Sequence, residues 1–324
     1  MKPSPVAAAP LGLDGQPPSQ ALAGLNRAAE AVWPQLHALW NAHGGAAAGS
    51  GFSVEVLATI DSSNTELMRR ARAGQAEPVL LVALEQTAGR GRMGKTWVSE
   101  PGASLTLSLG LPLRPAQWAG LSLAVGVALA EALAACLPPA ERSALQLKWP
   151  NDLWLHRAKL AGILVETAQG ARSGECPYVV VGVGINVAAP SGPLTHAAAP
   201  APGSLWPPVP PTGLAAHAHH FNAASDSIHP GPAQVPTAPA VLEAVAPALL
   251  QALLAFEVLG FSAFSQRFAS LDALHGQALV LSDGVQGTGC GVDDTGALLV
   301  LTEQGMRTVS SNEVSVRPQG APAC

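Results

Sequence analysis

The sequence predicts an α+β protein, in which a mixed β-sheet packed with a few helices is followed by a smaller all-β domain. Four strand-like segments follow one another and are separated by turns rather than by long helices, at 145–149, 153–156, 160–167 and 178–187. After Gly276, short apolar segments alternate with tight turns at 282–284 and 294–296. Strands joined by turns pair locally, so the sheet should contain few crossover helices.

At the N-terminus, residues 1–50 are expected to form an extension outside the main domain. Residues 1–19 are rich in Ala, Pro and Gly and are predicted to be disordered. From Leu22 to Leu39 the apolar residues recur at helical spacing, with an interruption at Pro34. Because proline removes a backbone hydrogen bond inside a helix, one or two short helices are predicted here.

The large domain is expected to span residues 51–272 and to open with a strand at 54–57. Residues 63–66 read Ser-Asn-Thr-Glu, which is typical of a capping box and predicts a helix that continues to Ala73. A continuous apolar run then predicts a strand at 78–84, and period-two alternation predicts another at 104–109.

A long helix is predicted next, from about Pro115. It contains an apolar stretch, 119–137, of nearly membrane-spanning length. The stretch includes Glu131, and 48% of the whole chain is hydrophobic, which is enough for a substantial core. We interpret the stretch as a buried core helix and expect no membrane association.

Residues 188–240 are predicted to be a flexible insertion, since their many Pro and Ala residues can bury little apolar surface. They contain His217, His219 and His220. A metal site there would need a further ligand and a fixed backbone, and this segment supplies neither, so no bound metal is predicted. Two helices are expected to follow, at 241–259 and 261–271.

The loop between the strands at 78–84 and 104–109 matches the P-loop pattern G-x-x-x-x-G-K-[ST] at residues 89–96. A P-loop leads from a strand into a helix, whose N-terminal amides bind phosphate. Here Pro101 and Gly102 follow closely and a strand comes next, so no helix is expected. The segment predicts a loop between two strands and argues against a P-loop nucleotide-binding module.

The same loop carries three cations, Arg90, Arg92 and Lys95, between glycines. Like charges this close repel one another, which favours a mobile loop until an anion neutralises it. Glycine lets the backbone approach a ligand, and a planar guanidinium suits phosphate or carboxylate. We therefore predict an anion-binding loop that becomes ordered on binding; a solvated basic hairpin is the alternative.

Charge and cysteine content restrict the class further. The formal net charge of −5 provides no general basic field for nucleic acid, and Arg27 is the one cation of the predicted N-terminal helical region, so no DNA-binding domain is expected. Of the 17 Lys and Arg residues, 11 lie between Arg69 and Lys159. The four cysteines have no C-x-x-C spacing and the N-terminus has no signal-peptide pattern, which favours a cytoplasmic protein.

The sequence GRGRMGKTW at 89–97 resembles the GRGRxGRxW loop of the biotin protein ligases. Four further signatures occur in family order, DSSNT at 61–65 before this loop, and KWPNDL at 148–153, KLAGILVE at 159–166 and VGVGINV at 181–187 after it. Lys95 stands where the family usually has Arg, which keeps the charge but loses the bidentate fork. The family ends in an SH3-like barrel, in agreement with the short strands expected in a C-terminal domain at 273–324.

The resemblance implies a ligase that uses ATP and Mg²⁺ to activate biotin as biotinyl-5'-AMP. It then transfers biotin to a lysine of a biotin carboxyl carrier protein or domain. The implied biotin-binding residues are Ser62, Ser63, Asn64, Gln86, Arg90, Gly91, Arg92 and Lys159. The implied ATP-binding residues are Gly89, Arg92, Lys95, Trp97, Asn151, Asp152 and Asn186, and the implied catalytic residues are Arg90, Arg92 and Lys159.

These residue types suit the implied chemistry. A carboxylate must attack the α-phosphate of ATP, so cations and Mg²⁺ are needed to bring two anions together. Residues 62–64 could instead act only as a helix cap, and residues 150–152 only as a turn. A lipoate-type ligase or acyltransferase of the same fold is the alternative function, although it lacks the Gly-Arg loop. The resembled family often self-associates, so a homodimer is an option that the sequence does not establish.

Overall fold

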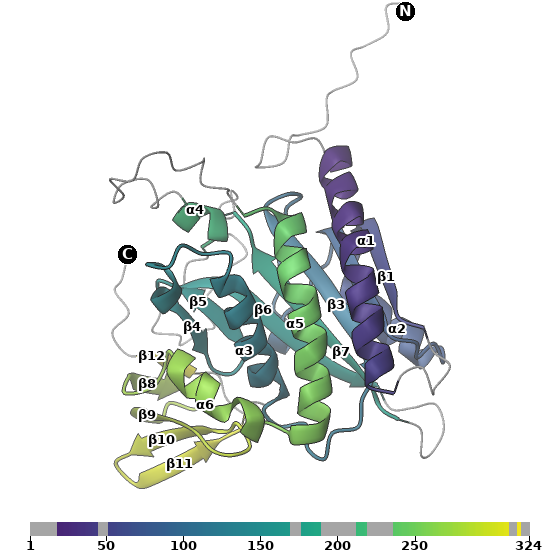
Figure 1. Cartoon of the computed structure of the whole chain (residues 1–324). Coiled ribbons are helices and arrows are strands. Elements are labelled where there is room, and N and C mark those ends of the chain that lie inside the picture. The colour runs from purple at the N-terminus through teal and green to yellow at the C-terminus, as the bar shows by residue number, and fades with distance from the viewer. Residues whose placement is uncertain are drawn as a thin grey trace, which may run out of the picture.

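The computed structural model describes residues 18–44, 51–168, 176–188, 212–218, 236–310 and 316–318. These residues form a seven-stranded mixed sheet with helices on both faces, followed by a five-stranded antiparallel sheet (Figure 1). The large sheet has the strand order β1-β2-β3-β7-β6-β5-β4. The predicted α+β class is therefore confirmed.

The large sheet consists of β1 (Ser53–Ile60), β2 (Val79–Gln86), β3 (Ser104–Pro112), β4 (Leu145–Lys148), β5 (Asp152–Leu155), β6 (Ala158–Ala168) and β7 (Tyr178–Asn186). Strands β1 and β2 pair in parallel, and every other neighbouring pair in this sheet is antiparallel. Each strand predicted in this region is present, with ends that differ by one to a few residues.

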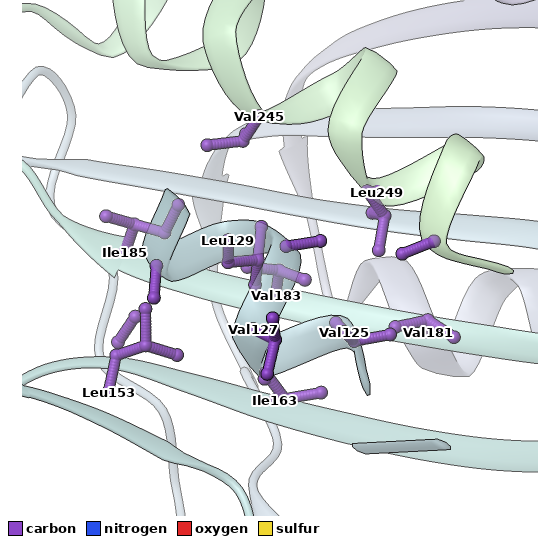
Figure 2. Close-up of a cluster of buried hydrophobic side chains, with 14 of the residues drawn as sticks. Val125, Val127, Leu129, Leu153, Ile163, Val181, Val183, Ile185, Val245 and Leu249 are labelled. Carbon is purple, nitrogen blue, oxygen red and sulfur yellow. The ribbon is translucent and has the colours of Figure 1, made fainter. Parts of the chain in front are cut away.

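Three long helices cover one face of the sheet, α1 (Pro18–Ala42), α3 (Leu121–Ala134) and α5 (Ala238–Leu259), whereas α2 (Ser63–Arg72) packs on the other face (Figure 1). In Figure 2, side chains of α3 (Val125, Val127, Leu129) and of α5 (Val245, Leu249) lie against side chains of β7 (Val181, Val183, Ile185). All of these side chains are buried, so this layer forms the main core. The helix α6 (Ser262–Leu271) follows α5.

The N-terminal helix differs from the prediction. Instead of one or two short helices broken at Pro34, α1 is one helix of 25 residues that contains Pro34. Its buried side includes Leu25, Val32, Leu36 and Trp40, which pack into the main core, while Pro34 is exposed. Burial of this apolar stripe outweighs the backbone hydrogen bond that proline removes. Residues 1–17 lie outside the described residues.

The start of α2 also differs from the prediction. Ser62, rather than Ser63, is the N-cap, and its Oγ accepts a hydrogen bond of 3.4 Å from the backbone N–H of Thr65. Glu66 does not complete a capping box, because it pairs with Arg69 and Arg70 on the helix surface. The shift by one residue leaves the side chain of Ser63 available for contacts inside the protein.

The apolar helices are buried rather than exposed. The predicted core helix is present as α3, although it begins at Leu121 and not near Pro115. Among the described residues, α5 is the one helix long and apolar enough to span a membrane by length and composition, and 61% of its most apolar window is buried. It packs against α1 and α3 at the centre of the helical layer (Figure 1). This is the arrangement of a core helix.

The C-terminal sheet contains β8 (Ala278–Leu281), β9 (Gln286–Val292), β10 (Leu298–Thr302), β11 (Gly305–Val309) and β12 (Val316–Pro318). Its order is β11-β10-β9-β8-β12. The two ends, β11 and β12, are not paired with each other, so among the described residues the expected barrel is open. This domain is tied to the large one, since the indole Nε1 of Trp149 donates a hydrogen bond of 3.0 Å to the carbonyl of Gly296.

Parts of the predicted insertion 188–240 have a defined structure. Residues 212–218 include the short helix α4 (Leu214–Ala218), and Leu214 is fully buried. The backbone N–H of Ala215 donates to the carbonyl of Val187 at 2.8 Å. The helix α5 begins at Ala238, inside the predicted insertion. Residues 189–211 and 219–235 lie outside the described residues.

Candidate active site

A pocket of about 160 Å³ lies on the α2 side of the large sheet. It is bounded by the start of α2, the loop at 89–97, the turn between β4 and β5, and strands β6 and β7. The predicted site residues that line it are Ser62, Ser63, Asn64, Gln86, Arg90, Gly91, Arg92, Lys95, Trp97, Asn151, Asp152 and Lys159. The structure therefore brings most of the predicted residues together from five sequence segments.

Two predicted residues, Gly89 and Asn186, lie beside this pocket and not in its lining. Gly89 is buried, and its carbonyl accepts a hydrogen bond of 2.9 Å from the N–H of Trp97, which closes the base of the loop. Asn186 is also buried, and its Nδ2 donates to the carbonyl of Lys159 at 3.3 Å. Both residues support neighbours that line the pocket.

The inner end of the pocket is a chain of hydrogen bonds between uncharged side chains and one carboxylate. The backbone N–H and the Oγ of Ser63 lie 2.7 and 3.1 Å from Oε1 of Gln86. Ser63 Oγ is 2.7 Å from Ser108 Oγ, and Ser108 donates to Oδ1 of Asn64 at 2.6 Å. Asn64 Nδ2 donates to Glu166 at 3.0 Å. Ser63, Asn64 and Ser108 are all at most 3% exposed, so this end is closed to solvent.

Two glycines of β7 make room for this arrangement. Val181 and Val183 face the helical layer (Figure 2), so Gly182 and Gly184 face the pocket side. A Cβ atom on Gly182 would overlap the side chain of Asn64, and one on Gly184 would overlap the indole of Trp97. The Gly-x-Gly pattern thus has a steric cause, because two pocket side chains lie directly on the strand.

The loop at 89–97 forms a narrow hairpin without a following helix. Gly91 N donates to the carbonyl of Lys95 at 2.7 Å, and an isolated β-bridge joins Arg90 to Thr96. The residues at the tip, Arg92–Gly94, form one 3₁₀ turn, in which Met93 has a φ of 55°. The chain then continues to β3. This confirms that the literal P-loop match joins two strands.

The outer part of the pocket is cationic. Lys159 Nζ lies 2.8 Å from Oδ1 of Asp152 and 5.9 Å from the centre of the Trp97 ring. Arg90 Nη1 lies 3.3 Å from Oε1 of Glu166, and half of the Arg90 side chain is exposed. Burial lowers the pKa of the Arg92 guanidinium and the nearby Asp152 raises it, with a net shift downward. An anionic ligand at this rim would offset the cost of keeping these cations close together.

Asp152 is a partly buried carboxylate at this rim. Burial raises the pKa of its carboxyl. Lys159, and to a smaller extent Lys148 and Lys95, lower this pKa by more than burial raises it, so the net shift is downward. The carboxylate is therefore charged at neutral pH and holds the ammonium of Lys159 in place. One carboxylate among three lysines leaves net positive charge for a phosphate or carboxylate ligand.

Replacing Asp152 by asparagine should lower the free energy of unfolding by about 1–3 kcal/mol, between the values for exposed and buried ion pairs. A lowered folded-state pKa contributes stability that is present above the unfolded value of about 4 and is lost as the pH falls through the folded value. The difference between wild type and variant should hence be constant near neutral pH and shrink below about pH 4.

Urea unfolding between pH 7 and pH 3 measures this difference. The matched control is Asp283→Asn, which removes a more exposed pair with Arg307 and should change stability by less than about 1 kcal/mol. A gap between wild type and Asp152→Asn that grows as the pH falls would contradict the assigned direction of the shift.

Some residues in or beside the pocket were not predicted from the sequence. Ser108 lies on the polar side of an alternating strand, together with Ser104 and Thr106. The period-two pattern of this strand could have indicated that Ser108 faces a polar site. Glu166 ends the KLAGILVE signature and is the acceptor for Asn64 and the partner of Arg90. Val316 lines the pocket from β12, more than 120 residues along the chain from β7, and no local pattern indicates this contact.

The site combines a closed, hydrogen-bonding end with a cationic rim on a mixed sheet. Such a site suits the binding of a ligand with an uncharged polar end and an anionic end, and the sequence of the chain matches a family of ligases. Residues 56–186 match the Biotin/lipoate A/B protein ligase family, and residues 279–317 match the Biotin protein ligase C terminal domain.

Individual relatives narrow the class. The biotin–[acetyl-CoA-carboxylase] ligase of Paracoccus denitrificans is 32% identical over 80% of this chain and 98% of its own length. That of Mycobacterium tuberculosis is 44% identical over 43% of this chain, which spans 52% of that relative. The biotin protein ligase of Aquifex aeolicus, solved with biotin and ATP, has a TM-score of 0.63 at 25% identity over 82% of this chain and 99% of its own. The chain belongs to the biotin protein ligase family.

Proposed function

We propose that this chain is an ATP-dependent biotin protein ligase, which forms biotinyl-5'-AMP and transfers biotin to a lysine of a biotin carboxyl carrier domain. The observation that carries the proposal is the division of one pocket into a closed, hydrogen-bonding end and a cationic rim. Biotin has the same division, with an uncharged ureido ring at one end and a carboxylate at the other. The relatives bear names and bound ligands that fit this activity.

The closed end favours biotin over lipoate. A ureido group offers both N–H donors and a carbonyl acceptor, which suit Ser63, Asn64 and Ser108. The dithiolane ring of lipoate offers no such donor. It would displace water from these buried polar groups without replacing the hydrogen bonds that the water makes. Sites built to hydrogen-bond a ligand discriminate strongly against analogues that lack the polar group.

The rim supports the adenylation step. The carboxylate of biotin attacks the α-phosphorus of ATP, an acyl–phosphate bond forms, and pyrophosphate leaves. Arg90, Arg92 and Lys159 reduce the repulsion between the two anions and stabilise the charge that develops. In the second step, the neutral amine of the acceptor lysine attacks the acyl carbon, and AMP leaves. The loop at 89–97, closed over the adenylate, would exclude water from the mixed anhydride.

We assign Mg²⁺ to the nucleotide phosphates, where it would supply positive charge for the departing pyrophosphate. The donor set fits this ion, because Asp152 lines the pocket with a carboxylate, and Asn186, beside the pocket, uses its Nδ2 in the hydrogen bond to Lys159 and keeps its amide oxygen. No step of the proposal needs a dedicated metal cage.

Thr96→Ala should leave the Mg²⁺ concentration needed for half-maximal adenylation within about twofold of the wild-type value, because Thr96 is not at the start of a helix and is not placed as a metal ligand. Asn186→Ala should raise it. ATP–pyrophosphate exchange at increasing Mg²⁺ measures both effects. A large rise for Thr96→Ala alone would restore the P-loop function.

The test of the proposed function is incubation of the chain with ATP, Mg²⁺, an acceptor carrier domain, and either labelled biotin or labelled lipoate. We expect biotin, and not lipoate, to appear on the acceptor lysine, and AMP and pyrophosphate to be released. Omission of ATP and replacement of the acceptor lysine by arginine are the controls. Transfer of lipoate alone would overturn the choice of substrate.

The remaining assignments concern the partners and the location of the protein. The acceptor is a carrier domain, and no nucleic-acid partner is proposed, since the described part of the N-terminal region is the single helix α1 packed on α5 and β1. Free thiols at Cys136, Cys176 and Cys290 suit a cytoplasmic location. Self-association would be measured by sedimentation with and without biotin and ATP.

A further inference from the structure

A second group of ligand-type side chains lies outside the pocket, at the far end of the β4–β5 hairpin. It consists of Glu141, His156 and His217, whose ligand atoms all lie within 4.8 Å of one another. The sequence interpretation found no further ligand for His217 because it considered only the insertion. The structure brings Glu141 and His156 to it from other segments.

Two of the three residues are held by a rigid backbone. Glu141 immediately precedes the 3₁₀ turn Arg142–Ala144, which leads into β4. His156 is in the turn after β5, and its N–H donates to the carbonyl of Ala144 at 3.2 Å. The pairing of β4 with β5 therefore fixes the two side chains next to each other, and His156 Nε2 contacts Oε2 of Glu141.

The third residue is oriented by a neighbour. His217 Nε2 lies 3.0 Å from Oγ1 of Thr212, while its Nδ1 lies 3.5 Å from Oε2 of Glu141. When Nε2 carries the proton and donates to the threonine, Nδ1 presents its lone pair to the cluster. A histidine whose other ring nitrogen is held in this way is the usual form of a metal ligand.

We propose that Glu141, His156 and His217 bind one divalent first-row transition metal of the zinc type, with Oε2, Nε2 and Nδ1 as ligand atoms and water as the fourth ligand. Two imidazoles and a carboxylate suit Zn²⁺ and Co²⁺ rather than Mg²⁺ or Ca²⁺. Ligand atoms of a tetrahedral zinc ion lie about 3.4 Å apart, given bonds of about 2.1 Å. The 3.5 Å between His217 Nδ1 and Glu141 Oε2 fits this spacing. The closer contact of His156 with Glu141 and the stacked His156 and His217 rings, whose centres are 4.8 Å apart, would have to open for the metal to bind.

The position of the site gives the metal a role. Residues 212–218 lie against the strands that carry the pocket, because Thr212 N donates to the carbonyl of Lys159 at 2.9 Å and Ala215 N to that of Val187. A metal at His217 would join this segment to the β4–β5 hairpin. It would thus hold residues 212–218 beside the strand end that carries Lys159. The proposal does not depend on the biotin ligase activity.

The test uses the full chain, treated with EDTA and then transferred to chelator-free buffer with Mg²⁺ present. We expect titration calorimetry with ZnCl₂ and metal analysis after dialysis to show one Zn²⁺ per chain. His217→Ala and Glu141→Gln should weaken binding by at least about 10- to 100-fold. His156→Asn should do the same, and asparagine tolerates the φ of 50° at this position. Circular dichroism and thermal unfolding without zinc show whether each variant is folded.

Two matched controls should bind zinc as the wild type does. His43→Ala removes a His–Glu pair outside the cluster, since His43 lies 2.8 Å from Glu257. The double variant His219→Ala/His220→Ala removes the neighbouring histidines of the sequence. Zinc binding that survives in folded His217→Ala, or that is lost in the double variant, would overturn the proposed ligands. His217→Ala could also lower thermal stability as much in EDTA as in zinc. The three residues would then stabilise the fold through hydrogen bonds alone, and the proposed metal site would be wrong.

Discussion

Replacing Arg92 by alanine should reduce adenylate formation, or the retention of the adenylate, by about 2–4 kcal/mol, which is the effect of losing one oriented donor. This corresponds to about 30- to 900-fold in rate. Arg92 lines the pocket at the tip of the cationic loop and is partly buried beside Asp152. Burial removes competing water, so its charge acts more strongly on a phosphate than that of an exposed arginine would.

The measurements are ATP–pyrophosphate exchange for formation and single-turnover decay of the bound adenylate for retention. Arg92→Lys keeps the charge but loses the planar fork, so it should recover only part of the loss. Arg72→Ala, an exposed arginine in the last turn of α2, is the control and should behave as the wild type. Unchanged formation and unchanged retention in Arg92→Ala would overturn the assignment of the loop.

Replacing Gly184 by alanine should lower the free energy of unfolding by about 1–3 kcal/mol, as overpacking does in a well-packed site, and weaken ATP binding. The added Cβ would overlap the indole of Trp97, and the ring has little room to move because Gly162 also lies against it. Displacement of Trp97 would move the end of the 89–97 loop and the ring over which Lys159 lies.

Urea unfolding and nucleotide titration measure the two effects. Gly51→Ala is the matched control, since no atom lies within 4 Å of the position of its Cβ. In a double-mutant cycle, Trp97→Ala should relieve most of the destabilisation by Gly184→Ala, because it removes the overlapping ring. Additive effects of the two substitutions would show that the overlap is not the cause.

Much of the fold was predictable because the hydrophobic pattern is local. The strands from β4 to β7 and the helix α3 each carry an apolar series with its own period, and the structure confirms them. The missing helix after Thr96 was also predictable, since Pro101 and Gly102 exclude it. The prediction failed at Pro34, where packing of α1 against the core overrides the local preference of proline.

The candidate site was predictable in its members but not in its geometry. Motif order indicated Ser63, Asn64 and Arg92, whereas the chain of hydrogen bonds through Ser108 depends on the register of β3 with β7. That register places Ser108 opposite Gly182, and the missing side chain at Gly182 leaves the space that Asn64 occupies. Such a contact depends on three segments at once.

The sequence by itself determined the α+β class and the strand–loop–strand form of the cationic segment, because each depends on neighbours within about ten positions. The resemblance of its motifs to a known family also indicated about half of the residues that line the pocket. Only the tertiary structure decided that Ser62 caps α2 while Ser63 turns inward, that Val316 reaches the pocket, and that His217 meets Glu141 and His156. These contacts join residues that are adjacent in space and distant along the chain. Their free energy comes from packing and pairing across elements, which no local pattern records.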